Sequence, residues 1–460
     1  MRSLVGRHPK GRHGRVPRHR RWLSKGFWAV TDQGLFALTN FTVSVLLGRW
    51  LSPSDYGAFA VAFSVLLFMG TVHTALLTEP MLIFGPSRFR ERTAAYVRQL
   101  STLNFLLTSV MGVVLLLVVA ALTVLQPPFM AATTLAALAV SAPAILFLWL
   151  MRRACYIESR PRLAAASGLV YALIVPAGMF SLKHVSALTA ASGLMIMGMS
   201  GIVVAWWLTL RLTRAGAEPT TAFTRSEVTR AHWTYGRWAL GSGLLSWVPS
   251  NAVVLALPLW YSLADAGTLR VATTLMLPVL HVQGALGLLF MPALVRARLS
   301  GQLRSRAIAM GSLFLALSAI YAPLVLIFGS WAVQLLFGTQ YSVDGTTLWL
   351  LAAIPFVSAV SGVSGAVLRA VERPDRVLWT YVAATAVTCL VGLPLVFAYG
   401  VNGALASLLL SAATTAILGT HASRRFMAAP RQPTGARTEP GAWADVRLSG
   451  GTRAGRGAAS

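Results

Sequence analysis

The sequence predicts an all-α, polytopic membrane protein of about twelve transmembrane helices arranged as two similar halves. The first observation is composition: 56% of the residues are hydrophobic, only 11% are charged, and the mean hydropathy is +0.67. A soluble domain carries about twice that charged fraction. The second observation is that the apolar residues form runs of about 20, the length that crosses a hydrocarbon core of about 30 Å as a helix. Backbone polar groups in lipid then require helices.

The third observation is an internal repeat. The stretch 50–62, WLSPSDYGAFAVA, returns at 260–272 as WYSLADAGTLRVA, with a constant offset between its matching positions. Each copy lies in a short turn between two apolar segments, where Asp caps the next helix and Gly permits a tight entry. Shared turn chemistry alone could produce part of this match, but the matching Trp, Ser and Ala favour a true repeat. Membrane proteins with two similar halves are most often transporters.

Twelve spans follow a polybasic segment. We expect residues 1–26 to form a disordered basic tail, 27–210 a first six-helix bundle, 211–237 a linker, 238–420 a second bundle and 421–460 a disordered tail. The predicted spans are 27–48, 56–77, 99–123, 130–151, 163–182, 187–210, 238–259, 267–293, 307–329, 345–368, 377–398 and 401–420. The segment 27–48 is too long for the apolar region of a cleavable signal peptide, so we predict that it is retained as the first span.

The positive charges give the orientation. If the N-terminus is cytoplasmic, the tails and the loops on that side hold 36 of the 39 Lys and Arg residues. The opposite side holds only Arg49, Lys183 and Arg270. Because cytoplasmic loops carry the excess of Lys and Arg, this count predicts that both termini are cytoplasmic. The predominance of Arg over Lys and the abundance of Ala indicate a GC-rich genome, so we expect a bacterial inner membrane.

Several classes of function are disfavoured. The net charge of +26 lies in tails and loops along a membrane protein, so we predict no nucleic-acid partner and expect the basic segments to lie against membrane lipids. Cys155 and Cys389 are the only cysteines, and no His, Cys or carboxylate cluster has ligand spacing. The chain shows no phosphate-binding loop and no catalytic triad order. We therefore predict no metal, no cofactor and no enzymatic activity.

Two arginines near the membrane are candidate ligands for an anionic substrate. Arg270 stands inside the second repeat, one turn into its span, where the first repeat has Ala60. It is a candidate to bind a head group in a cavity, and the alternatives are snorkelling to the interface or pairing with Asp265. Arg49, at the end of the first span, is a second candidate, and the alternative is an interfacial anchor or a pair with Asp55.

Polar residues within the spans complete the predicted site. Asp32 is the deepest acid, and it is a candidate proton-coupling residue or a residue of the cytoplasmic mouth paired with Lys25 or Arg88. Asn40 and Asn251 are candidates to bind sugar hydroxyls, or they bond neighbouring helices. His73 and Trp247 are expected to serve packing.

Four short motifs lie at or near the ends of predicted spans: 47–57 (LGRWLSPSDYG), 266–272 (AGTLRVA), 336–341 (LFGTQY) and 399–404 (YGVNGA). In this order and spacing they resemble polysaccharide flippases, the O-antigen and exopolysaccharide lipid exporters of the multidrug/oligosaccharidyl-lipid/polysaccharide exporter superfamily. Leu269 departs from the pattern, since an aromatic residue is common there. The resemblance covers about 25–419 and implies two six-helix bundles in a V around a central cavity. It also implies export of an undecaprenyl-pyrophosphate-linked saccharide by alternating access, for surface polysaccharide biosynthesis.

Other functions stay open at this point. An ion-coupled multidrug antiporter of the same superfamily is one alternative, although a cationic drug favours carboxylates and the spans hold essentially Asp32 alone. A membrane-embedded glycan ligase is another, and it would need catalytic groups in the outside loops, which are short and poor in acids. A scaffold with basic tails is a third. As partners of a flippase we expect a polysaccharide polymerase and glycosyltransferases.

Overall fold

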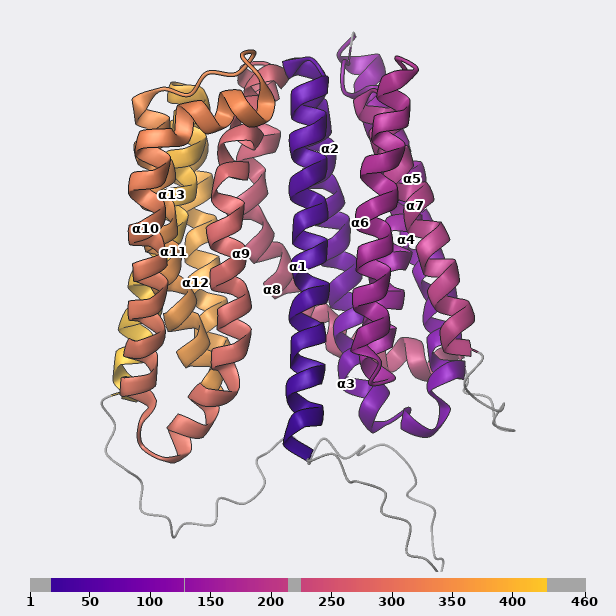
Figure 1. Cartoon of the computed structure of the whole chain (residues 1–460), viewed down its shortest axis with the longest axis vertical. Helices are drawn as coiled ribbons and strands as arrows, with labels where there is room; N and C mark the ends of the chain where they lie inside the picture. The colour runs from indigo at the N-terminus through magenta and orange to yellow at the C-terminus, as the bar shows by residue number, and fades with distance from the viewer. Residues whose placement is uncertain (1–17, 128, 214–224, 428–460) are drawn as a thin grey trace, which may run out of the picture.

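The computed structural model describes residues 18–127, 129–213 and 225–427, and this part of the chain contains helices and no β-strand. The helices run along the long axis of the molecule, with the two halves side by side and α1 between them in the view of Figure 1. This confirms the predicted fold class. The expected tail residues 1–17 and 428–460 lie outside the described residues.

The N-terminal half consists of seven α-helices, with a π-helical turn that continues α2 into α3 and a short 3₁₀ turn. Its elements are α1 (Arg18–Trp50), α2 (Pro53–His73), η1 (Thr74–Thr78), α3 (Glu79–Ser87), η2 (Arg90–Arg92), α4 (Thr93–Leu125), α5 (Ala132–Ile157), α6 (Pro161–His184) and α7 (Ala190–Thr213). α1 therefore begins at Arg18, within the range predicted as a tail. Its main core packs around α5, which lies against α4 and α7.

The C-terminal half follows the same plan. Its elements are α8 (Arg225–Trp260), α9 (Leu263–Leu299), α10 (Leu303–Phe337), α11 (Gly345–Ala370), α12 (Pro374–Val387), η3 (Thr388–Gly392) and α13 (Leu393–Met427). α8 begins inside the range predicted as a linker, and α13 extends beyond the predicted last span. The helix ends differ because charged end turns continue a helix into the interface, where hydropathy no longer detects it.

The final two spans form one continuous helical stretch that turns back on itself. Pro374–Met427 contains 54 residues, about 81 Å of helix, far more than the roughly 30 Å of a hydrocarbon core. Gly400 breaks the helix with a positive φ of 54°, a conformation that glycine adopts readily. A Cβ on Gly403 would lie 1.9 Å from the Leu395 carbonyl oxygen, so the two arms are in backbone contact. The predicted turn into a twelfth span is thus present.

The repeated turns have equivalent local structures. Ser52 caps α2 by accepting a hydrogen bond from the Asp55 backbone N–H at 3.1 Å. Ser262 caps α9 by accepting one from the Asp265 N–H at 3.3 Å, and the Asp265 carboxylate accepts the Ser262 N–H at 3.1 Å. The sequence repeat therefore encodes the same helix start twice.

The two repeats also meet in space. A Cβ on Gly57 would lie 1.6 Å from the Leu263 carbonyl oxygen, and one on Gly267 would lie 2.7 Å from the Pro53 carbonyl oxygen. Only glycine permits α2 and α9 to approach this closely. The contact lies at the end of the bundle that carries Arg49 and Arg270, here called the Arg-poor face; the opposite end, with the charge-rich loops, is the Arg-rich face. The halves are therefore closed against each other at the Arg-poor face.

At the Arg-rich face, α8 lies against the N-terminal half. The ring of His232 bonds the Tyr96 hydroxyl at 2.7 Å and the Leu76 carbonyl oxygen at 2.9 Å. Tyr235 donates its hydroxyl to the Glu79 carboxylate at 2.8 Å. Further along, α8 packs on α12 and α13 of its own half. α8 therefore starts on one half and ends in the other.

We expect Gly57→Ala to separate the halves at the Arg-poor face, because the added methyl group collides with backbone that no side-chain movement can relieve. Spin labels at the exposed Leu125 of α4 and Trp331 of α10 would report a longer distance by electron resonance. Gly34→Ala is the matched control, since nothing lies within 4 Å of its added Cβ. An unchanged distance in Gly57→Ala would contradict the contact.

Candidate functional site

Arg270 lies between the two halves, one turn beyond the glycine contact. It is partly buried on α9 and reaches across to α1, where its Nη2 donates a hydrogen bond to the Ser44 hydroxyl at 3.1 Å. Its guanidinium carbon lies 4.3 Å from the centre of the Phe63 ring of α2, a cation–π geometry. Arg270 is therefore directed into the junction of the halves rather than toward the interface or Asp265, which is engaged in the helix cap.

The charge of Arg270 has no carboxylate partner. Within the described residues it takes part in no salt bridge, and its Nε is buried without a hydrogen-bond acceptor. The neighbouring Tyr56 hydroxyl is also buried and makes no hydrogen bond of good geometry, although the side chains of Ser44, Thr274 and Arg270 lie near it. The buried Arg270 Nε without an acceptor carries a desolvation cost that an anionic ligand at the same place would offset. This arrangement is suited to bind an oxyanion.

The first three motifs of the sequence gather around this junction at the Arg-poor face. Gln340 donates its side-chain amide to the carbonyl oxygens of Gly48 at 2.7 Å and Leu51 at 3.1 Å. Phe337 and Tyr341 lie against the ring of Tyr56, with centroids 6.5 and 6.3 Å away. Residues from 47–57, 266–272 and 336–341 therefore form one contact between the halves, which we call the interhalf contact.

The fourth motif lies at the same end of the C-terminal half. Asn402 donates to the Asp344 carboxylate at 3.0 Å and accepts the Thr347 hydroxyl at 2.7 Å. Asp344 caps α11, and hydrogen bonding by Thr347 holds the pKa of its carboxyl below the usual value. Tyr261, next to the second repeat, donates to the Phe397 carbonyl oxygen at 2.9 Å. These hydrogen bonds hold the segment around the fourth motif against the starts of α11 and of α9, the helix that contains Arg270.

The other predicted ligands lie in different surroundings. Arg49 is exposed and donates to the Leu335 carbonyl oxygen of α10, so it links the halves and does not pair with Asp55. Asn251 donates to the Trp247 carbonyl oxygen of its own helix at 3.2 Å. Trp247 in turn donates to the Ser64 carbonyl oxygen at 3.3 Å and packs between the halves. Asn40 is half-buried on α1, one turn before Ser44.

Asp32 belongs to a second polar cluster, within the N-terminal half. Its carboxylate is 1% exposed and accepts Arg152 Nη2 at 2.7 Å and Nε at 3.2 Å. Its other oxygen accepts the Tyr156 hydroxyl at 2.7 Å. The Arg152 guanidinium carbon lies 4.4 Å from the centre of the Phe36 ring. The pairing expected with Lys25 or Arg88 was wrong for Arg88, which bonds Glu227 at 2.8 Å.

The two clusters are separate sites. Asp32 lies twelve residues before Ser44 on α1, which is about 18 Å of helix. It lines a pocket of about 150 Å³ with Gln33, Thr74 and Trp149, near the Arg-rich face. The structure therefore does not bring Asp32 and Arg270 into contact, and any coupling between them must pass through helix movement.

Sequence reasoning missed the partners of Asp32. Arg152 was assigned to a loop because it follows an apolar run, but α5 continues to Ile157 and buries it. The spacing of Arg152 and Tyr156, four residues apart on one helical face, was the available signal. His73 is buried and bonds Asn104 at 2.8 Å, in the packing role expected for it. No group of three metal-ligating side chains is placed to hold a metal in the described residues.

Comparison with known proteins identifies the fold. No family model and no curated protein matches the chain. The inward-facing conformation of a multidrug resistance MATE family transporter of the MOP superfamily is 13% identical, with a TM-score of 0.68 over 87% of this chain and 98% of that chain. An outward-facing conformation of a multidrug resistance MATE family transporter is 12% identical, with a TM-score of 0.59 over 88% of this chain and 95% of that chain. A MOP superfamily transporter from Pyrococcus furiosus is described as having a binding pocket of reverse polarity. It is 12% identical, with a TM-score of 0.61 over 89% of this chain and 95% of that chain.

We expect Arg152→Ala to destabilise the N-terminal half by about 3–5 kcal/mol, because it leaves the buried Asp32 carboxylate without its partner. Detergent-based unfolding of the purified protein measures the change. Arg88→Gln is the control, since it removes an exposed pair worth only about 0–1 kcal/mol. Adding Asp32→Asn to Arg152→Ala should recover part of the lost stability. An equal loss of stability in Arg152→Ala and in the control Arg88→Gln would refute the buried pair.

Proposed function

We propose that this protein is a secondary transporter that works by alternating access and carries an anionic, lipid-linked saccharide across the membrane. The observation that carries the proposal is Arg270, an unpaired cation at the junction of the two halves. The fold shared with MOP superfamily transporters supports the transport mechanism. The saccharide class rests on the four motifs and their resemblance to polysaccharide flippases.

Alternating access requires that the halves separate at one face while they close at the other. The interhalf contact closes the Arg-poor face through glycine backbones, aromatic rings and the Gln340 hydrogen bonds. These contacts lie at one end, so relative movement of the halves would release them together. The higher TM-score to an inward-facing than to an outward-facing MATE transporter fits a state closed at that face.

The electrostatics of the described residues favour an anionic substrate. Asp32 is neutralised by Arg152 and is not free to bind a cation. Glu79, which accepts the Tyr235 hydroxyl, lies toward the Arg-rich face and away from Arg270. Arg270 is a cation between the halves without a carboxylate partner in the described residues, and its Nη2 donates to the Ser44 hydroxyl. Pyrophosphate binds best to such charge-assisted donors. We propose that Asn40 and Asn251, on α1 and α8, contact sugar hydroxyls and that Arg49 contributes to the entrance.

An ion-coupled multidrug antiporter is the second candidate, because several of the structures with this fold are multidrug MATE transporters. In that reading, the Asp32 carboxylate would exchange Arg152 for a cation during transport. The MOP superfamily transporter with reverse pocket polarity illustrates that pocket charge varies within this fold. For either function we propose a non-enzymatic protein of a bacterial inner membrane, with both termini cytoplasmic. As a flippase, we propose that it works beside a polysaccharide polymerase and glycosyltransferases.

The decisive experiment uses a deletion strain. Its lipids are extracted, and undecaprenyl-pyrophosphate-linked saccharide is quantified beside surface polysaccharide and drug sensitivity. Accumulation of the lipid-linked saccharide with loss of surface polymer, both reversed by the intact gene, supports the flippase. Changed drug sensitivity with neither effect supports the antiporter instead.

We expect Arg270→Ala to abolish transport, while Arg270→Lys retains part of it, because lysine keeps the charge but loses the forked geometry of the guanidinium. Complementation of the deletion strain at matched protein level measures this. Lys183→Ala is the control, as an exposed cation of the same face. Full complementation by Arg270→Ala would rule out a role for Arg270 in binding the head group.

We also predict that Asp32 takes part in ion coupling. The Asp32→Asn variant should then transport with an altered dependence on external pH, because its side chain no longer exchanges a proton. Transport into vesicles at several external pH values is the measurement. A pH profile identical to that of the unaltered protein would remove Asp32 as the coupling residue.

A further inference from the structure

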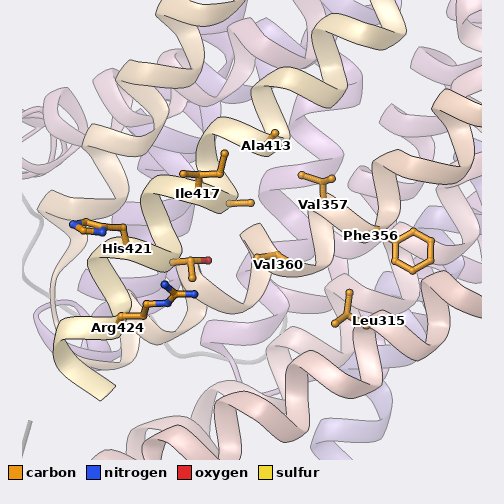
Figure 2. A pocket seen from close by; sticks show the side chains of 10 residues that line it. Leu315, Phe356, Val357, Val360, Ala413, Ile417, His421 and Arg424 are labelled. Carbon is orange, nitrogen blue, oxygen red and sulfur yellow. The ribbon is translucent and has the colours of Figure 1, made fainter. Parts of the chain in front are cut away.

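The C-terminal half contains an apolar groove remote from both polar clusters. It has a volume of about 560 Å³ and lies between α10, α11 and α13 (Figure 2). Its apolar lining includes Leu315, Phe356, Val360 and Ile417. The volume is within the roughly 300–1,000 Å³ typical of ligand sites, and such sites are mainly apolar with a few placed polar groups.

The groove has a positive charge at one end only. His421 and Arg424, three residues apart on α13, line its Arg-rich end. In Figure 2 the guanidinium of Arg424 is turned toward the apolar side chains of the groove. Both residues are exposed, and neither forms a salt bridge within the described residues. The charge is therefore available to a ligand.

The length of the groove matches one leaflet of a membrane. Its lining on α13 runs from Ala413 to Arg424, which lies eleven residues further on, or about 16 Å of helix. The hydrocarbon core is about 30 Å thick, so one leaflet contributes about 15 Å. A chain that begins at Arg424 and follows the groove would end near the membrane midplane.

We propose that this groove binds one anionic phospholipid of the leaflet on the Arg-rich side. An acyl chain lies against Leu315, Phe356, Val360 and Ile417, and the phosphate accepts hydrogen bonds from Arg424, with His421 beside it. A partner transmembrane helix would need an apolar face through both leaflets, whereas this groove spans one and ends in a cation. Basic pockets between transmembrane helices on the cytoplasmic side are suited to anionic head groups.

The bound lipid would bridge α10 and α13 across α11. A second hollow of about 190 Å³ adjoins the groove between the same helices and shares Leu315, Val360 and Thr420 with it. α10 and α13 each pack on α11 but scarcely contact each other, so the gap between these two helices lacks close packing. A lipid that fills the groove replaces this packing, so it acts as a structural ligand of the C-terminal half. The proposal does not depend on the identity of the transported substrate.

The test measures lipid binding to the full-length protein purified in a neutral detergent. Dioleoyl-phosphatidylglycerol and dioleoyl-phosphatidylcholine are titrated, and bound lipid is counted by native mass spectrometry alongside the thermal midpoint. We expect phosphatidylglycerol to bind more tightly and to raise the midpoint more. Arg424→Gln should weaken phosphatidylglycerol binding about tenfold, because it removes charge-assisted hydrogen bonds to phosphate.

Arg425→Gln is the matched control, because this neighbouring arginine is exposed and does not line the groove. Val360→Phe fills the groove and should weaken both lipids. Equal binding by the Arg424→Gln and Arg425→Gln variants would overturn the proposal. Stabilisation by soluble glycerol phosphate equal to that by the lipid would also overturn it, as would unchanged lipid binding by Val360→Phe. A dimer that Val360→Phe dissociates would show that a second copy of the chain occupies the groove, and would overturn it as well.

Discussion

The backbone contact between Gly57 and Gly267 is the constraint on which the arrangement of this protein depends. Because neither residue carries a side chain, α2 and α9 approach until the Leu263 and Pro53 carbonyl oxygens meet the opposing glycines. That approach sets the distance between the halves at the Arg-poor face. It also places Arg270, three residues after Gly267, within reach of Ser44 and Phe63. This close approach of two glycines thus determines both how the halves close and where the Arg270 cation lies.

The buried charges are distributed unequally between the halves. In the N-terminal half, Asp32 is held by Arg152 and Tyr156, so its negative charge is satisfied within one bundle. Arg270 receives a single hydroxyl from the other half and no carboxylate. A satisfied pair resists change, whereas an unsatisfied cation gains from a ligand. This asymmetry is why we propose the junction, rather than the Asp32 pocket, as the site for an anionic substrate.

α8 gives the molecule a mechanical link between its halves. It begins against the N-terminal half through His232 and Tyr235 and ends within the C-terminal half. Pro249 lies between these attachments, and proline removes a backbone hydrogen bond that would otherwise stiffen the helix. Relative movement of the halves must therefore bend or slide this helix.

The sequence by itself determined the membrane class, the helical architecture, the repeat and the asymmetry of charge, because hydropathy, turn chemistry and loop composition are local properties. It also made Arg270 a candidate, since a lone arginine inside a repeat is visible without a structure. The tertiary structure decided which residues meet. Arg152 lies 120 positions from Asp32, and Gln340 lies 292 from Gly48. Such pairings depend on helix rotation and crossing, which no local pattern specifies. The ion pair of Asp32, the interhalf contact and the apolar groove of the C-terminal half therefore emerged only from the packed fold.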